Sequence, residues 1–333
     1  MFTLPIALFT VTACAPQTPG DTSRAADTDT HADTDTDTDT ESDTDTDTDT
    51  DTDTDSDTDT DTDTDTDTDT DTDTDTDTDT DTDTGAVAGF VVVPASTFDM
   101  GDTPGQPDDG FEVHTVTLTH DYHVGVTEVT EDQFLAVMGY NPSTDGCTAG
   151  DCPVENVNQH EAAAYANAMS DAEGIEECYT CTMGESGVFC SVAVDPYDCA
   201  GYRLPTEAEW EGAARCGTDL QHAGSDTGSD VGWFSGNSGG NSNPVAGLAP
   251  NACGIYDMSG NVWEWTQDWY EAYSSDAVTD PTGPESGSTV VLRGGSFSDD
   301  AARVSVASRL ATFRGSTQFD RGLRLARSVP SAR

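Results

Sequence analysis

The stretch that decides the fold is Ile255-Tyr-Asp-Met-Ser-Gly260-Asn-Val-Trp-Glu-Trp265-Thr-Gln-Asp-Trp-Tyr270. It contains three of the chain's five tryptophans, and acidic residues at positions 257, 264 and 268 lie between the aromatic rings. Aromatic side chains bury large apolar surfaces, and the N–H of a buried tryptophan usually finds a polar partner. The stretch therefore predicts a buried corner of the core that is braced by polar contacts.

Upstream of this corner, residues 27–84 are almost entirely a repeat of Asp and Thr. The segment carries 28 of the 65 acidic residues and almost no apolar side chain. Ordering such a chain costs conformational entropy that no burial offsets, and its like charges extend it. We expect a disordered tether that spans at most roughly 190 Å. O-glycosylation of its threonines and weak calcium collection by its aspartates are the alternatives.

The first 14 residues have the features of an export signal. Residues 1–13 form a largely apolar run that is too short to span a bilayer, and small residues precede Cys14. This pattern resembles the lipobox of bacterial lipoproteins and predicts lipidation of Cys14, followed by a short spacer at residues 15–26. We expect a cell-envelope protein, lipid-anchored at the outer surface or in the periplasm. A plain signal peptide on a secreted protein is the alternative.

The remaining residues, 85–333, are expected to form one folded domain, which is strongly acidic. They carry 36 acidic residues against 10 arginines, a net charge of about −26, and the chain has no lysine. A negative field of this size repels the phosphates of nucleic acids and the headgroups of anionic lipids. We therefore expect no nucleic-acid partner, and contact with a membrane only through the lipid anchor.

Three segments near the start of the domain have strand patterns. Residues 90–93 are a short apolar run stopped by Pro94. Residues 113–119 alternate apolar with polar side chains, which is typical of a half-buried strand. Residues 122–129 are the third strand candidate.

Helices are predicted where a capping residue is followed three positions later by Glu or Gln, because the two side chains satisfy each other's backbone N–H groups. After the third of these signals, Trp210 and Ala213 lie on one apolar helical face. Residues 217–250 have little periodicity, so they need other anchors. The signals are Thr130 with Gln133, Asn158 with Glu161, and Thr206 with Glu209.

Four histidines are candidate metal ligands. His114 and His120 share a face of the expected strand, whereas His123 lies beyond a turn, so we interpret all three as exposed polar positions. His160 is followed by a glutamate, as in zinc-protease helices. The second histidine of that motif would stand at position 164, which is Ala164, so the motif is absent.

Cysteines offer the missing anchors for the irregular segments. An even number of cysteines in an exported domain predicts disulfides, although eight cysteines allow 105 pairings. A structural zinc site is the alternative for the cluster between residues 178 and 199, because two of its cysteines, Cys178 and Cys181, are separated by two residues. The eight candidates are Cys147, Cys152, Cys178, Cys181, Cys190, Cys199, Cys216 and Cys253.

The opening stretch is also the best candidate for a metal site. Asp257 and Glu264 place two carboxylates around the backbone carbonyls of Gly260 and Val262, at the short irregular spacing that calcium accepts. The alternative is a structural loop whose acidic side chains pair with arginines.

Several long motifs occur together in a fixed order and closely resemble the formylglycine-generating enzyme, or sulfatase-modifying factor, family. The resemblance covers nearly all of residues 90–327. It implies a single α+β domain with a C-type-lectin-like fold, much irregular structure and structural calcium held by the four residues just named. The motifs are Phe90–Gly101, Val126–Thr130, Pro153–Val157, Gly201–Trp210, Asn251–Tyr270 and Leu292–Phe297.

The resemblance does not extend to the oxidase chemistry. Family enzymes hold copper with two cysteines just after the Arg-Gly-Gly-Ser segment, and Cu(I) prefers thiolates. The matching positions here are Asp299 and Val304, and no cysteine lies between Leu292 and Arg333. We therefore expect no bound copper and assign no catalytic residue. The polar residues left as a candidate cleft are Arg293, Ser296, Asp299 and Arg303.

The sequence favours a lipoprotein whose domain has lost the oxidase site and acts as a binding or structural module. Its partner would be a protein or a small molecule that the sequence does not identify. The first alternative is an enzyme that uses the same cleft for another reaction. Formylglycine generation on a protein cysteine is the second.

Overall fold

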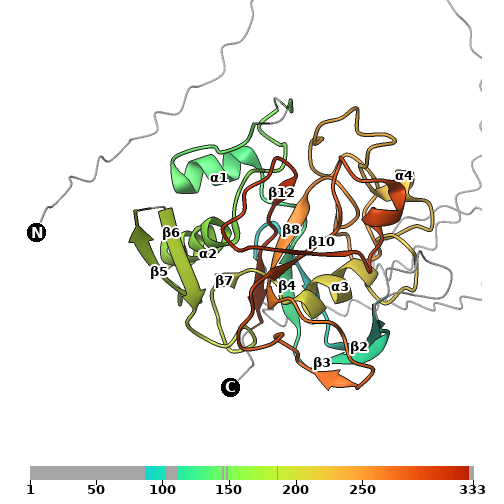
Figure 1. The fold of residues 1–333 in the computed structure, drawn as a ribbon, viewed down its shortest axis with the longest axis horizontal. Coiled ribbons are helices and arrows are strands. Elements are labelled where there is room, and N and C mark those ends of the chain that lie inside the picture. The colour runs from blue at the N-terminus through green and yellow to red at the C-terminus, as the bar shows by residue number, and fades with distance from the viewer. Residues whose placement is uncertain (1–86, 102–111, 145, 148, 186, 330–333) are drawn as a thin grey trace, which may run out of the picture. The chain divides into compact units, whose positions relative to one another are not determined.

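The computed structural model describes residues 87–101, 112–144, 146–147, 149–185 and 187–329. The expected export signal, spacer and tether therefore lie outside the described residues. Short strands and helices alternate with long loops in the described part, which is the α+β organisation expected from the sequence (Figure 1). No helix within these ranges is both long and apolar enough to cross a membrane.

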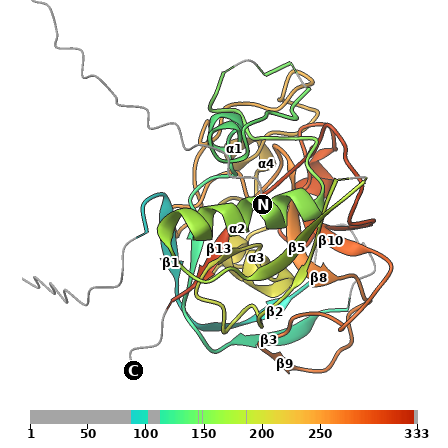
Figure 2. The same cartoon turned by 90° about the vertical axis from the view of Figure 1, so that its left-hand side faces the viewer.

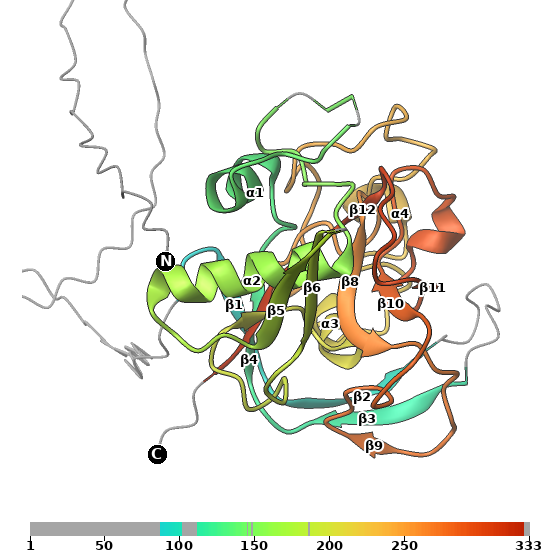
Figure 3. The ribbon, with the colours of Figure 1, turned by 60° about the vertical axis from the view of Figure 1, so that its left-hand side comes forward.

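The tryptophan-rich stretch lies in a four-stranded sheet with the order β11 (Arg309–Thr312), β10 (Val290–Arg293), β8 (Trp263–Trp269) and β12 (Arg321–Gly322). Strand β8 pairs antiparallel with β10 and parallel with β12. Figure 3 shows β8 and β10 side by side. Strand β8 therefore pairs with a segment 58 positions further along the chain, at β12.

A second four-stranded sheet joins the start and the end of the domain, in the order β1 (Phe90–Val93), β4 (Tyr122–Gly125), β13 (Ala326–Ser328) and β7 (Tyr202–Arg203). The third sheet has the order β2 (Ser96–Met100), β3 (His114–Leu118) and β9 (Val278–Thr279). Figure 2 shows this third sheet at the lower edge of the view and α1 (Glu131–Met138) near the top. The last sheet is the hairpin of β5 (Tyr179–Gly184) and β6 (Gly187–Val192).

The expected strands at 90–93 and 113–119 are confirmed as β1 and β3, but the strand expected at 122–129 ends at Gly125. Beyond this residue the backbone leaves the sheet and bonds to separate segments. The Val126 N–H donates to the Gly89 carbonyl, and the Val129 N–H donates to the Leu323 carbonyl. The apolar pattern therefore persists because the chain stays buried, although it no longer forms a strand.

All three predicted helix starts are confirmed. Helix α1, α2 (Gln159–Glu173) and α3 (Glu207–Arg215) each begin with both hydrogen bonds of a capping box. Such a cap typically contributes about 1 kcal/mol. Two short helical elements were not predicted, α4 (Gly228–Val231) and the 3₁₀ helix η1 (Ala301–Val304).

The predicted buried corner is confirmed. Trp263 and Trp265 are 2% and 0% exposed and belong to the core cluster that includes residues of α1 and α2. Trp210 of α3 is also fully buried, in the second core cluster. The Trp265 Nε1 donates to the Val157 carbonyl at 2.8 Å, and the Trp210 Nε1 donates to Glu264 Oε2 at 2.6 Å. Each of these indoles therefore has the polar partner that burial requires.

The eight cysteines of the domain form four disulfides, which confirms the disulfide prediction. The zinc alternative is wrong, because all four thiols of its proposed cluster are bridged. One of these bridges joins opposite residues of the β5–β6 hairpin, and another closes the segment that contains it. The pairs are Cys147–Cys152, Cys178–Cys199, Cys181–Cys190 and Cys216–Cys253.

The interpretation of the three amino-terminal histidines as exposed is wrong for two of them. Only His120 has an exposed side chain; His114 and His123 are 8% and 3% exposed. His114 packs against the ring of Tyr273, whose loop is far along the chain, so local periodicity did not reveal its burial. Within the described residues, no group hydrogen-bonds to either ring nitrogen of His123.

The burial of His123 leads to a prediction about pH. Burial lowers the pKa of His123, and the positive charge of Arg327, its partner on β13, lowers it further. The unfolded chain therefore takes up a proton near pH 6.5 while the folded chain does not, so stability is lost as the pH falls below that value. A pKa difference of one corresponds to about 1.4 kcal/mol.

We expect His123→Leu to lose less stability than the wild type between pH 7 and pH 5, as measured by urea unfolding with the disulfides intact. Both proteins contain the same carboxylates, so the titration of these groups cancels when the unfolding free energy of one protein is subtracted from that of the other at each pH. His120→Leu, at an exposed position, is the matched control and should follow the wild type. Parallel stability curves for wild type and His123→Leu would contradict the prediction.

Candidate functional site

The candidate cleft begins where β10 ends in two glycines. Gly294 and Gly295 have φ angles of 96° and 75°, which side-chain-bearing residues rarely adopt. A Cβ on Gly295 would collide with the Arg303 carbonyl and would lie 2.7 Å from Val304 Cγ1. The two glycines therefore let the chain turn tightly against η1, which brings Ser296 close to the residues that follow it.

Asp299 fixes this turn to strand β8. Its Oδ2 accepts hydrogen bonds from Ser296 Oγ at 2.6 Å, from the Ser296 N–H at 3.1 Å and from Trp263 Nε1 at 2.8 Å. On the other side, Arg303 Nε lies 3.7 Å from Asp299 Oδ1, and the guanidinium lies over the Trp263 ring. The structure therefore brings Ser296, Asp299 and Arg303 together around Trp263.

Val304, the second position that the resemblance matches to a family cysteine, has a different environment. Val304 ends η1 and is fully buried. Its carbonyl lies 3.0 Å from the Nδ1 of His222, another buried side chain. Position 304 therefore contributes an apolar side chain to the interior.

Arg293 is not part of this group, although the sequence placed it in the same candidate cleft. Its guanidinium is fully buried and forms an ion pair with Glu211. It also donates to the carbonyls of Val306 and Ala307, at 2.8 and 3.0 Å. A strand alternates its side chains between two faces, but the glycine turn after β10 breaks this alternation, so sequence spacing could not show that Arg293 points elsewhere.

The four calcium candidates follow one another where the chain enters β8. Asp257 has a φ of 59° and is 3% exposed. Its Oδ2 accepts a hydrogen bond from the Ala246 N–H at 2.7 Å, whereas no described group hydrogen-bonds to the buried Oδ1. Burial raises the pKa of Asp257 to about 6. An unpartnered buried carboxylate oxygen is what a bound cation would satisfy, so Asp257 fits a calcium ligand.

Glu264 is already engaged by protein groups. Arg324 donates to its two carboxylate oxygens at 2.7 to 3.1 Å, and Trp210 Nε1 donates to Oε2. The arginine pairing weighed against calcium therefore occurs at Glu264 and not at Asp257. A calcium ion held by both carboxylates would share Glu264 with Arg324.

A third carboxylate, which sequence reasoning missed, lies beside these residues. Glu128 is fully buried and accepts hydrogen bonds from Asn261 Nδ2 and the Val262 N–H, at 2.7 and 3.0 Å. Burial raises the pKa of Glu128 well above its usual range, and the negative charges of Asp257 and Glu264 raise it further. Its place in the Val126–Thr130 motif was the only signal in the sequence.

The comparisons with known proteins agree with this architecture. The family described as "Sulfatase-modifying factor enzyme 1-like domain" matches residues 74–329. The formylglycine-generating enzyme of Thermomonospora curvata is 33% identical over 289 residues, covering 72% of this chain and 93% of that protein. The chaperone protein LppX of Paenibacillus barcinonensis is 35% identical over 184 residues, covering 46% of this chain and 64% of that protein.

A solved structure gives the same result for the fold. Treponema denticola variable protein 1 superposes with a TM-score of 0.64 and 34% sequence identity, covering 72% of this chain and 95% of that one. The family match at residues 74–329 spans all the residues that the structure describes, and the superposed structure shares their fold. The chain therefore belongs to the sulfatase-modifying factor family.

Proposed function

We propose that this protein is an exported member of the family that lacks the copper-dependent oxidase reaction and acts as a binding or structural module. The observation that carries the proposal is the environment of Asp299 and Val304. Asp299 is a hard oxygen ligand whose Oδ2 already accepts three hydrogen bonds, and Val304 is a buried side chain without a donor atom. Neither suits Cu(I), which prefers soft ligands.

The remaining cysteines support the same conclusion. A thiol bound in a disulfide cannot ligate copper as a thiolate. All eight cysteines of the folded domain are paired, and the ninth, Cys14, lies outside the described residues. The folded domain therefore offers no thiolate pair to replace the one missing at positions 299 and 304.

An enzyme that reuses the cleft is the second candidate, because Ser296 Oγ donates to Asp299 Oδ2 at 2.6 Å, as a hydroxyl and its base would. The burial of Ser296 argues against this second candidate. Ser296 is fully buried, so a substrate would reach the hydroxyl only if the loop moved. The relative named as a chaperone also favours a role in binding, although this chain matches 64% of that relative's length.

Calcium and the lipid anchor complete the proposal. Calcium would be held by the side chains of Asp257 and Glu264 and the carbonyls of Gly260 and Val262, where it would brace the entry to β8. Four disulfides are typical of a protein that folds in an oxidising compartment, which agrees with export. Lipidation of Cys14 would then hold the domain at the cell envelope through the acidic tether.

The oxidase reaction is tested directly by mass spectrometry. A peptide with the sequence pattern Cys-x-Pro-x-Arg is incubated with the full chain, copper and oxygen, and the mass of its cysteine is followed. We expect no conversion to the aldehyde above the level without protein. The formylglycine-generating enzyme of Thermomonospora curvata, under the same conditions, is the positive control. Conversion by this chain would overturn the proposal.

A further inference from the structure

A cavity lies at the opposite end of β8 from the Asp299 turn. This cavity of about 290 Å³ is lined by Asp268 and Trp269, the last residues of β8, by Glu207 at the start of α3, and by the loop that follows β8. Asp299 contacts Trp263, the first residue of the same strand. Seven residues of strand span about 20 Å, so the cavity is separate from the Asp299 turn.

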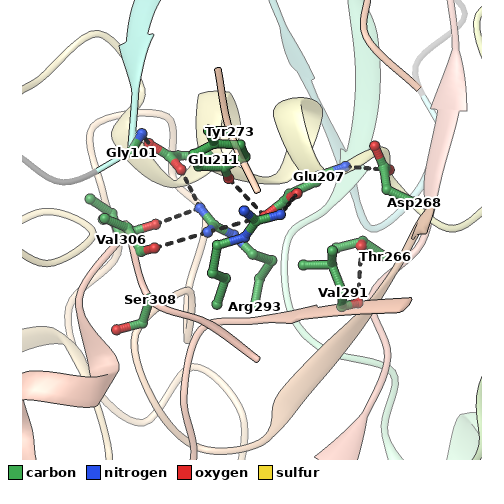
Figure 4. Close-up of polar contacts among 12 residues, drawn as sticks. Gly101, Glu207, Glu211, Thr266, Asp268, Tyr273, Val291, Arg293, Val306 and Ser308 are labelled. Carbon is green, nitrogen blue, oxygen red and sulfur yellow. Dashed lines mark hydrogen bonds and ion pairs between the residues drawn. The ribbon is translucent and has the colours of Figure 1, made fainter. Parts of the chain in front are cut away.

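Glu207 is electrically neutralised within the protein. Its Oε2 accepts from Arg309 Nη2 at 2.7 Å, and its Oε1 lies 3.5 Å from Arg293 Nη1. The Tyr273 hydroxyl donates to Oε1 at 2.8 Å. Figure 4 shows Glu207 between Asp268 on one side and Arg293 on the other. This carboxylate therefore leaves no uncompensated charge in the cavity.

Two other carboxylates of the lining, Asp268 and Glu271, differ from Glu207 in their partners. Asp268 is 4% exposed, and its Oδ2 accepts a hydrogen bond from the Glu207 N–H at 2.7 Å. Glu271 is exposed and also lines the cavity. Within the described residues, neither carboxylate forms an ion pair. Burial raises the pKa of Asp268. A positive group beside this carboxyl would favour its ionised form.

The guanidinium in the lining is already occupied. Arg309 donates to Glu207 and, at 3.0 Å, to the Glu271 carbonyl. Its guanidinium lies over the rings of Tyr270 and Tyr273, at 4.5 and 3.9 Å. An anionic ligand would have to displace these contacts and would approach two carboxylates, so the cavity disfavours anions.

Apolar and aromatic residues make up most of the remaining lining, including Trp269, Tyr273, Pro281 and Pro284. His114 and Ser274 are its other polar members. Aromatic faces attract cations as well as apolar groups. The cavity thus combines a negative end with walls that suit a flat apolar stem.

We propose that this cavity binds a small organic cation, a primary amine on an apolar or aromatic stem, with its ammonium group between Asp268 and Glu271. The site does not involve the Asp299 turn, so it does not depend on the absence of the oxidase reaction. The acidic surface of the domain would raise the local concentration of such a ligand.

Three probes of nearly the same shape test the charge preference: benzylamine, benzyl alcohol and benzoate, titrated into the full chain by calorimetry. We expect benzylamine to bind most tightly and benzoate least. The Asp-Thr tract also attracts amines without specificity, so the site itself is tested with variants. Absence of benzylamine binding, or equal affinity for all three probes, would overturn the proposal.

Glu271→Gln removes the exposed charge without disturbing the core and should raise the Kd for benzylamine about threefold. Asp268→Asn should raise it about tenfold, because the charged hydrogen bond is made in a buried site. Neither change should alter the affinity for benzyl alcohol to the same extent. Glu185→Gln, at the exposed turn of the β5–β6 hairpin, is the matched control. Equal Kd values for Glu271→Gln and Glu185→Gln would assign the binding to the general negative field and overturn the site.

Discussion

Arg293→Ala is expected to lower the free energy of unfolding by about 3–5 kcal/mol, because it removes one partner from a buried network of charges. The guanidinium is fully buried, pairs with Glu211 and Glu207, and donates to two backbone carbonyls (Figure 4). It also lies over the Trp210 ring at 5.2 Å. The alanine would leave these acceptors buried without their donor.

The measurement is guanidinium unfolding of wild type and variant under oxidising conditions, so that the disulfides stay intact. Arg303→Ala is the matched control, since its exposed guanidinium lies 3.7 Å from its acidic partner and should contribute less than about 1 kcal/mol. If Arg293→Ala does not fold, Arg293→Met keeps the stem and still removes the charge. An unfolding free energy within about 1 kcal/mol of wild type for Arg293→Ala, or for Arg293→Met if the alanine variant does not fold, would contradict the prediction.

Removing calcium is expected to have the second large effect. A ligand that binds only the folded state at about 1,000 times its Kd stabilises it by about 4 kcal/mol, and chelation removes this contribution. We expect EDTA to lower the melting temperature of the wild-type chain. An unchanged melting temperature would remove the calcium proposal.

Two substitutions at position 257 locate the effect. Asp257→Asn keeps an oxygen donor and tolerates the positive φ, so its melting temperature should still respond to EDTA. Asp257→Gly also accepts this φ but removes both oxygens, and its response should disappear. An equal response in both variants would show that the chelated ion binds elsewhere, for example at the aspartates of the tether.

The features that sequence predicted well were those with local causes. The capping boxes at Thr130, Asn158 and Thr206 depend on residues three positions apart, and all three helices begin there. The tryptophan corner followed from composition alone. Local chemistry of this kind is visible without knowing the tertiary contacts.

The features that could not be predicted depend on partners far apart in the chain. Glu264 meets Arg324 and Glu128 meets Val262, over 60 and 134 positions. His114 is covered by Tyr273, and disulfide pairing has no local signal. For the same reason the sequence grouped Arg293 with Ser296, although Arg293 pairs with Glu211 and Ser296 bonds to Asp299.

The three hydrogen bonds of Asp299 make a cysteine at this position costly for the fold. A substitution of Asp299 by cysteine would leave Trp263 Nε1 without its acceptor, whereas Ser296 Oγ would keep its contact with Ser298 Oγ. An unsatisfied buried donor costs about 1–3 kcal/mol, while a single thiol at position 299 would still lack a second thiol at position 304. If the proposal is right, natural selection would meet this stability penalty before any gain in activity, so copper chemistry should rarely arise in this lineage by single steps.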